Sequence, residues 1–524
     1  MKREKMLQQI QSDPDNWDLI IIGGGATGLG AAVDAAARGY RTLLLEQNDF
    51  AKATSSRSTK LIHGGLRYLQ QGNIQLVVEA LKERGLLCRN APHLISHRKF
   101  LVPNYHWWEG TYYGFGLKIY DLLAGKLGIE KSKYLSKEKT KSLVPTLAQE
   151  DLRGSVVYYD GQFDDARLAI TLAKTFKDLG GVPVNYMPVT NFIKRNGKIR
   201  GVKAIDLETD RSYSIYSAAV INATGIFIDQ IRKMDDPASM DILAPSQGVH
   251  IVVDQSFMPS QTAILIPHTE DKRVVFIVPW HQKLLIGTTD TPILHPSLEP
   301  RPFQEEIEYL LKHASKYLSP PPKASDILSC FAGIRPLLQG TAKQGKSSAL
   351  SRDHAISISP SNLISISGGK WTTYRKMGED VIDKAIKVAS LPEKPCRTKN
   401  LHLHGYATNM DPEDLWSTYG SNSQILYEMM KENPKWGDSL HKKLPYLEVE
   451  VVWAARYEMA RSVEDVLSRR TRSLLLDARA SLEAAPRVAK ILADELGYDE
   501  KWQKNQVDAF TALAKRYCFP LGSR

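Results

Sequence analysis

Three glycines near the start of the sequence have the spacing of a turn that binds a nucleotide. Gly23, Gly25 and Gly28 follow an apolar stretch and precede an alanine-rich one. Glycines in this setting let the backbone approach a pyrophosphate, and the first amides of the following helix point at its negative charge. Glu46 ends the next apolar stretch, where a carboxylate can accept a hydrogen bond from a ribose hydroxyl. The pattern predicts a dinucleotide site.

The elements that position this site are a strand, a helix and a second strand, which together form one βαβ unit. Two segments from much later in the chain, residues 218–222 and 362–367, have the composition of buried strands and end in turns of small residues. Strands of this kind return to an open sheet beneath a cofactor. Because the site draws on three distant segments rather than one continuous nucleotide domain, the sequence favours FAD over NAD.

The expected fold class is α/β, with a discontinuous doubly wound FAD-binding domain, an inserted β-rich domain and an all-helical C-terminal domain. Residues 463–476 are expected to form one helix of the last domain, with Ser462 as its cap. The predicted boundaries are 1–16 for an N-terminal extension, 17–90, 155–235 and 330–390 for the FAD-binding domain, 91–154 and 236–329 for the substrate or cap domain, and 396–524 for the helical domain.

Composition and charge narrow the class of protein. The chain has 524 residues, of which 43% are hydrophobic and 24% charged, so a multidomain globular protein is expected. A net charge of +11 favours an anionic partner. The four cysteines stand far apart, so we expect no disulfide framework and no metal site. The sequence also shows no leader pattern and no apolar run of membrane-spanning length, which favours a cytoplasmic location.

Beyond the glycine turn, several motifs closely resemble those of FAD-dependent glycerol-3-phosphate dehydrogenases. They are TSSRSTKLIHGGLRYL (54–69), FAGIRPL (331–337), SRDH (351–354), SGGKWTTYR (367–375) and, in the helical domain, RYEMARSVEDVLSRRTR (456–472). The resemblance runs in order through nearly the whole chain. It implies non-covalent FAD and oxidation of sn-glycerol 3-phosphate to dihydroxyacetone phosphate, with the electrons passed to membrane quinone.

The resemblance also implies which residues contact the substrate. A phosphate dianion that leaves water needs several fixed positive charges around it, and arginine offers a bidentate fork. The positively charged candidates inside the matched motifs are Arg67, Arg335, Arg352 and Lys370, and the hydroxyl candidates are Tyr68 and Thr288.

A base must take the proton of the substrate C2 hydroxyl, and histidine suits this role near neutral pH. His250 and His63 both remain candidates, with Arg335 lowering the energy of the alkoxide in either case. The residues expected to contact FAD besides the three glycines and Glu46 are Thr54, Ser55, Ser56, Lys60, Val189, Thr224, Gly225, Gly369 and Thr372.

Other functions compete with this interpretation. Within the family, an oxidase would pass electrons to O₂ and release hydrogen peroxide. A flavin amine or hydroxy-acid oxidase would not need so many positively charged positions. The anaerobic and calcium-regulated forms are disfavoured, because the chain has no cysteine-rich extension and no EF-hand pattern. A nucleic-acid-binding protein is disfavoured too, since the basic residues that can be placed lie in flavin motifs.

Residues 105–126 contain seven aromatic residues and two lysines, a mixture typical of a membrane interface. With the positive net charge, this segment predicts peripheral binding to an anionic membrane at the inner face of the cell membrane. The alternatives are a helix of the domain core and a contact in a homodimer.

Overall fold

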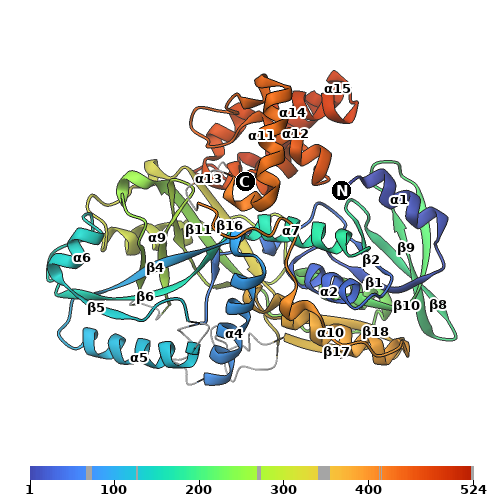
Figure 1. The fold of residues 1–524 in the computed structure, drawn as a ribbon, viewed down its shortest axis with the longest axis horizontal. Coiled ribbons are helices and arrows are strands. Elements are labelled where there is room, and N and C mark those ends of the chain that lie inside the picture. Colours follow the sequence, from blue (N-terminus) through green and yellow to red (C-terminus); the bar gives the residue numbers. More distant parts are fainter. Residues whose placement is uncertain are drawn as a thin grey trace.

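The computed structural model describes residues 1–65, 73–125, 128–267, 269, 273–339, 354–411, 414 and 416–520. Two sheets lie side by side, and the C-terminal helices pack across their top (Figure 1). Within the described ranges, no helix combines the length and the apolar character that crossing a membrane requires.

The first sheet has β10 and β1 at its centre, and its main path runs β17-β18-β10-β1-β2-β7. β1 pairs in parallel with β2 and with β10, and its residues are nearly all buried, as expected of a sheet covered on both faces. Its strands are β1 (Trp17–Ile22), β2 (Thr42–Leu45), β7 (Val182–Val184), β8 (Val189–Arg195), β9 (Lys198–Ile205), β10 (Ser212–Asn222), β17 (His354–Ile358) and β18 (Leu363–Gly368).

Alternate residues of β1 pack into different cores. Leu19 and Ile21 pack under a layer of helices, whereas Ile20 and Ile22 pack on the side covered by α1 (Arg3–Ser12) and the β8–β9 hairpin. The helical layer consists of α2 (Ala26–Ala37), α7 (Asp165–Asp178) and α10 (Tyr374–Ala389). The predicted return of residues 218–222 and 362–367 to the first sheet is therefore confirmed, as β10 and β18.

The second sheet is mostly antiparallel and runs β15-β11-β14-β13-β12-β4-β6-β3, with β16 beside β11 and β5 beside β6. Its strands are β3 (Leu61–Ile62), β4 (Ile95–Asn104), β5 (Lys133–Ser136), β6 (Gly154–Phe163), β11 (Ser246–Asp254), β12 (Ala263–Ile266), β13 (Val275–Trp280), β14 (Lys283–Gly287), β15 (Thr291–Pro292) and β16 (Ser329–Arg335). The helices that accompany it are α4 (Ile74–Asn90), α5 (Glu109–Ala124), α6 (Lys137–Leu143) and α9 (Gln304–Ser315).

The segments that form each sheet do not coincide with the predicted domain boundaries. Nearly all of β6 lies in the segment 155–235 and nearly all of β16 in the segment 330–390, both assigned to the FAD-binding domain, yet each strand pairs within the second sheet. The chain passes from the second sheet to the first after each of these strands, and a change in composition does not mark such a passage.

The C-terminal domain is helical as expected, with α11 (Ser423–Glu432), α12 (Glu448–Tyr457), α13 (Ser473–Leu476), α14 (Ala478–Leu496) and α15 (Glu500–Ala514). Residues 463–476 do not form one regular helix. Asp465–Arg470 forms a π-helical turn, Arg472 has a φ of 58°, and α13 begins after it. Ser462 nevertheless caps this segment, because its Oγ accepts the amide of Asp465 at 3.1 Å.

Candidate active site

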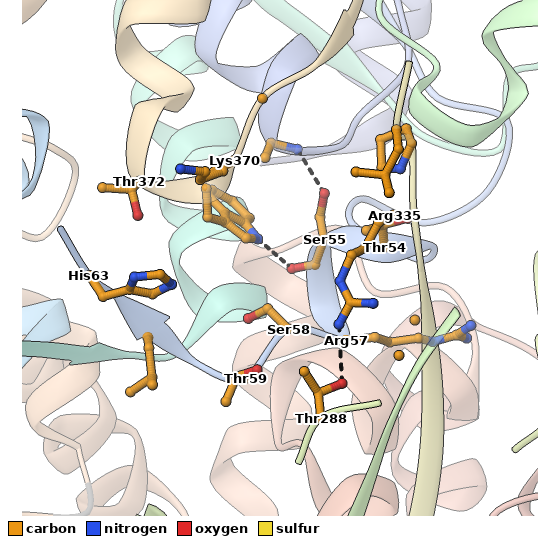
Figure 2. A pocket seen from close by; sticks show the side chains of 18 of the residues that line it. Thr54, Ser55, Arg57, Ser58, Thr59, His63, Thr288, Arg335, Lys370 and Thr372 are labelled. Atoms are coloured by element: carbon orange, nitrogen blue, oxygen red, sulfur yellow. Dashed lines mark hydrogen bonds between the residues drawn. The ribbon is translucent and has the colours of Figure 1, made fainter. Parts of the chain in front are cut away.

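A pocket of about 950 Å³ is lined by residues of both sheets and of α5 (Figure 2). At one part of it the carboxyl ends of β1, β2 and β10 meet the amino end of α2. At another part stand side chains of β11 and β16. The pocket therefore brings the predicted nucleotide turn and the predicted substrate residues to one place.

The glycine turn is shaped by close backbone contacts. Gly23 has a φ of 111°, which glycine adopts readily, and a Cβ atom at Gly28 would lie 1.9 Å from the Gly23 carbonyl oxygen. The Gly24 amide donates to Glu46 Oε2 at 2.6 Å, and the Asn48 amide donates to Glu46 Oε1 at 2.8 Å. Burial raises the pKa of Glu46, while these two amides oppose that rise. The turn and its carboxylate form one hydrogen-bonded unit.

Thr54 and Ser55 link this turn to three other elements. Ser55 Oγ accepts the amide of Ala26, the first residue of α2, at 2.9 Å. Thr54 Oγ1 donates to the carbonyl of Ile334 on β16 at 2.7 Å. The indole of Trp371 donates to the Ser55 carbonyl at 2.8 Å. Trp371 was not among the predicted contacts, although it lies within the SGGKWTTYR motif.

The residues around the turn fit FAD. A Cβ at Gly23 would lie 2.7 Å from the carbonyl oxygen of Ala223, so the backbone leaves space only for glycine beside the amides of α2. Of the predicted cofactor contacts, those that line the pocket are Gly23, Gly25, Glu46, Thr54, Ser55, Val189, Thr224, Gly225, Gly369 and Thr372. Gly28 and Ser56 stand outside this lining; Gly28 supports the turn from behind.

Lys60 does not face the pocket. Its Nζ bonds Asp165 Oδ1 and Oδ2, both at 2.7 Å, and the Ser56 carbonyl at 2.6 Å, and its side chain is fully buried. Burial lowers the pKa of Lys60 against the attraction of Asp165. Since an ammonium has three donors, these acceptors occupy Lys60 fully. The motif indicated that Lys60 lies near the site, but it did not indicate the direction of the side chain. We infer that Lys60 stabilises the backbone of residues 56–60.

Arg335 stands in the pocket wall at the end of β16. Its guanidinium contacts Asp290 Oδ1 and Thr288 Oγ1, each at 3.2 Å, and the Thr289 carbonyl at 3.0 Å. A Cβ at Gly248 would lie 2.4 Å from Arg335 Nη2, so glycine at this position leaves room for the arginine. Figure 2 shows Arg335 and Thr288 on one side of the pocket and His63 and Thr372 on the other.

His250 and His63 both line the pocket but differ in environment. His250 Nε2 lies 3.0 Å from Thr59 Oγ1, and its ring stacks on Phe331 with centroids 5.1 Å apart. Burial moves the pKa of His250 well below its usual value, and the charges of Lys60 and Arg335 act in the same direction. His63 is half-buried, and its Nδ1 accepts the Gly65 amide at 3.0 Å.

Three predicted substrate residues, Arg67, Tyr68 and Arg352, lie outside the described residues. Lys370 lines the pocket, as do Arg335 and Thr288. Residues that the sequence did not single out also line it, among them Thr59, which meets His250, and Asp290, which meets Arg335. Both belong to stretches whose neighbours were singled out, but side-chain partners 191 and 45 residues away leave no local signal.

Comparison with known proteins identifies families on both parts of the chain. Residues 18–375 match the family model described as FAD dependent oxidoreductase. Residues 364–503 match the model described as the C-terminal domain of alpha-glycerophosphate oxidase. FAD is therefore the cofactor of this fold.

Named relatives are similar over nearly the whole chain. A mitochondrial glycerol-3-phosphate dehydrogenase of Homo sapiens is 39% identical, over 97% of this chain and 74% of the relative. One from Schizosaccharomyces pombe is 38% identical, over 95% of this chain and 87% of the relative. Among solved structures, a glycerol-3-phosphate dehydrogenase from Bacillus halodurans complexed with FAD has a TM-score of 0.81 and 30% identity, covering 100% of this chain and 99% of that one.

Proposed function

We propose that this chain, which belongs to the family of FAD-dependent glycerol-3-phosphate dehydrogenases, oxidises sn-glycerol 3-phosphate to dihydroxyacetone phosphate in the pocket between its two sheets. One observation carries the assignment of the site. Arg335, Thr288 and Lys370 face the same pocket as the glycine turn of α2. Residues that can bind an anionic substrate and a turn that can bind a dinucleotide thus line the same pocket.

In this proposal the cofactor's phosphates lie at Gly23–Gly25, against the first amides of α2, and Glu46 accepts a ribose hydroxyl. When bound, FAD accepts the hydride that leaves C2 of the substrate. Gly369 and Thr372 approach from the end of β18, and Thr224 and Gly225 from the end of β10. The chain's own part is to hold and orient both partners of the transfer.

Arg335 is placed to bind the substrate phosphate and to stabilise charge on its C2 oxygen. Its contacts to Asp290, at 3.2 Å, and to the Gln247 carbonyl, at 3.4 Å, are long for charge-assisted hydrogen bonds, which are typically about 2.7–2.9 Å. Together with Thr288 Oγ1, at 3.2 Å, and the Thr289 carbonyl, at 3.0 Å, these partners orient the fork at the pocket wall, where substrate oxygens can replace its longer contacts. Lys370 adds a second positive charge, and Arg67, Tyr68 and Arg352 keep their predicted roles.

For the proton of the C2 hydroxyl we propose His250, reached through the Thr59 hydroxyl. Both residues line the pocket, and their polar atoms are 3.0 Å apart. His63 is less suited as the acceptor. Its Nδ1 already accepts an amide, so in the neutral ring Nε2 carries the proton and donates a hydrogen bond.

The pH dependence separates the two histidines. Because the pKa of His250 lies well below its ordinary value of 6.5, its proton-accepting form persists as the pH falls. We therefore expect kcat/KM, expressed per concentration of substrate dianion, to stay level from about pH 8 to pH 6.5 and below. Steady-state kinetics across this range test it. A fall in kcat/KM with a midpoint near the ordinary histidine value of about 6.5 would contradict His250 as the proton acceptor.

The electron acceptor is proposed to be membrane quinone, on the evidence of α5. One face of α5 is exposed and apolar: Phe115 is 70% exposed and Leu122 79%, while Trp107, just before the helix, is 80% exposed. The opposite face packs inward through Tyr113, Leu117, Tyr120 and Ala124. In Figure 1, α5 lies along the lower edge of the molecule, away from the C-terminal helices. Such a stripe suits the headgroup region of a bilayer.

The same helix forms a wall of the pocket. Tyr112 and Phe115 line the pocket although each is more than half exposed, so the pocket reaches the surface at this stripe. Deeper, this part is bounded by apolar side chains, among them Phe100, Leu265 and Phe276. An apolar passage from the stripe toward the cofactor supports a lipid-soluble acceptor. We place the enzyme at the inner face of the cell membrane, with exposed Lys131 and Lys133 near anionic lipid.

Replacing Phe115 with serine should weaken binding to anionic vesicles by about 10-fold, because a large apolar side chain no longer enters the bilayer. Oxidation of sn-glycerol 3-phosphate with a water-soluble dye should be kept. Sedimentation with vesicles at low salt measures the binding. Met240, which is 84% exposed near the first sheet, offers the matched control Met240→Ser, which should bind as the parent does. If Phe115→Ser instead dissociates a dimer and leaves vesicle binding intact, the stripe is a contact between subunits.

Anaerobic addition of sn-glycerol 3-phosphate to the purified holoenzyme tests the function itself. The flavin absorbance should bleach, dihydroxyacetone phosphate should form, and a quinone analogue should restore the absorbance. The C-terminal match to an alpha-glycerophosphate oxidase domain keeps the oxidase as a second candidate. One hydrogen peroxide released per substrate oxidised in air, with no reduction of quinone, would establish the oxidase instead.

A further inference from the structure

The segment of residues 46–57 wraps around the glycine turn and is the structural support of the nucleotide site. Its first residue accepts the Gly24 amide, and the Ala51 amide donates to the Gly24 carbonyl at 3.0 Å. The ring of Phe50 packs against the same glycine, since a Cβ there would lie 2.8 Å from Phe50 Cδ1. Any shift of the segment 46–57 therefore moves the turn.

Two arginines of the C-terminal domain hold this segment from outside. Arg470 bonds both oxygens of Asp49, Nη1 to Oδ2 at 2.7 Å and Nη2 to Oδ1 at 2.8 Å. Arg469 bonds Asp49 Oδ2 through Nε. All three side chains are at most 2% exposed. Burial favours protonation of Asp49, but the arginines keep its pKa well below the ordinary value. Asp49 is thus a buried carboxylate shared by two arginines from over 400 residues away.

The π-helical turn Asp465–Arg470 makes this arrangement possible. It replaces the regular helix expected here and places two consecutive arginines on one carboxylate. Asp465 steadies the turn by accepting the amides of Arg461, at 2.8 Å, and Ser462, at 3.1 Å, while its Oδ1 accepts Arg469 Nη2 at 2.8 Å. π-turns are rare and frequently occur at functional sites.

Two further ionic contacts reach the same segment. Lys52, which lines the pocket, pairs with Glu464 of the C-terminal domain at 2.7 Å. Arg57, which also lines the pocket, pairs with Glu299 at 2.6 Å, and the hydroxyl of Tyr517 donates to that carboxylate at 3.0 Å. The C-terminal domain thus contacts the cofactor wall directly at Asp49 and Lys52, and it reaches Arg57 through Glu299.

We propose that the C-terminal helical domain is a clamp for the cofactor, in which Arg469 and Arg470 act through Asp49 as positioning residues for the glycine turn. The inference rests on the proposed placement of the FAD phosphates at that turn. Buried ion pairs are an inefficient way to dock two domains, because desolvation offsets much of their attraction. Their value here is orientation, since a bidentate fork fixes the carboxylate and the backbone that carries it.

A clamp of this kind couples two equilibria, and the coupling must be reciprocal. If a docked C-terminal domain strengthens FAD binding, FAD binding must strengthen the docking by the same factor. The wild-type protein can therefore be tested without any substitution. Addition of FAD to the apoprotein should slow amide hydrogen exchange at residues 465–472 by at least about 5-fold. Helix α15, in the same domain but outside these contacts, serves as the internal control.

The outcomes of this exchange experiment distinguish the clamp from the cofactor placement. Protection at residues 23–26 and at residues 465–472, with α15 unchanged, supports the clamp. Protection at residues 23–26 alone overturns the clamp and leaves the FAD placement intact. Absence of protection at both places overturns the placement and the clamp together.

A pair of matched variants provides the second test. Arg470→Lys keeps the charge but loses the fork, and we expect FAD affinity, measured by flavin fluorescence on the apoprotein, to fall about 10-fold. The control is Arg461→Lys. Arg461 makes the same two-pronged contact across the domain boundary, to Glu208 at 2.8 Å and 2.8 Å, but away from the segment 46–57. It should leave FAD affinity within about 2-fold.

The melting temperature separates positioning from simple stabilisation. In Arg470→Lys the rise in Tm on adding FAD should shrink, whereas in Arg461→Lys it should match the parent. If Arg470→Lys lowers the Tm of the apoprotein and the holoenzyme equally, with unchanged FAD affinity, the arginines are only structural and the proposal is wrong.

Discussion

Replacing Arg335 with methionine should lower kcat/KM for sn-glycerol 3-phosphate by about 100- to 1,000-fold, the scale seen when a preorganised donor to a developing oxyanion is removed. Methionine fills similar space without the charge. The guanidinium is held toward the pocket by Asp290 and the Thr289 carbonyl, so its orientation exists before substrate binds. Steady-state kinetics with a water-soluble acceptor would measure the change.

Two comparisons make the Arg335 result specific. With glycerol, which has no phosphate, the loss should be smaller, since only the interaction with the C2 oxygen disappears. The matched control is Arg487→Met, because Arg487 also bonds a carboxylate, Glu448, but wholly within the C-terminal domain. If kcat/KM falls equally for glycerol and for sn-glycerol 3-phosphate, Arg335 does not bind the substrate phosphate. A loss below about 3-fold on both would remove Arg335 from the site altogether.

Replacing Gly25 with valine should abolish FAD binding while the chain still folds. Gly25 has a φ of −86°, which any residue adopts, and the nearest atom to an added Cβ is Ser55 Oγ at 3.0 Å. The fold should accommodate the valine by a small shift of the Ser55 side chain, but the valine would cover the first amides of α2, where the phosphates are proposed to lie. The flavin content after purification measures FAD binding, and a circular dichroism spectrum shows whether the chain is folded.

Gly437→Val is the matched control for this substitution. Gly437 lies in the C-terminal domain, and an added Cβ meets nothing closer than Met430 Sδ at 3.6 Å. It should purify with full flavin. A folded Gly25→Val protein with full flavin occupancy would contradict the proposed position of the phosphates.

The nucleotide turn could be predicted from the sequence because residues close together in the chain form it. The glycine turn needs an apolar strand before it, a helix after it and a carboxylate at the end of the next strand, all within 30 residues. The structure has this order, in β1, α2 and Glu46. The cap by Ser462 is local in the same sense, and it was confirmed although the helix that follows is irregular.

The directions of side chains could not be read in the same way. Lys60 belongs to the motif of residues 54–69, yet its ammonium turns away from the pocket toward Asp165, which is 105 residues further on. The predicted domain boundaries group β6 and β16 with the first sheet, although both strands pair within the second, for a related reason. The partner of a strand depends on which neighbouring strand packs beside it in the folded protein. The composition of a strand does not identify that neighbour.

The sequence by itself determined the α/β class, the nucleotide turn and the candidate charges, because short-range backbone chemistry and the resemblance of whole motifs suffice for these. Only the tertiary structure decided that Thr59 meets His250, that Asp290 orients Arg335 and that two arginines of the last domain meet on Asp49. Each of these contacts joins residues between 45 and 421 positions apart. Their geometry depends on how the sheets and helices pack, and a buried ion pair is stable only where that packing aligns both partners.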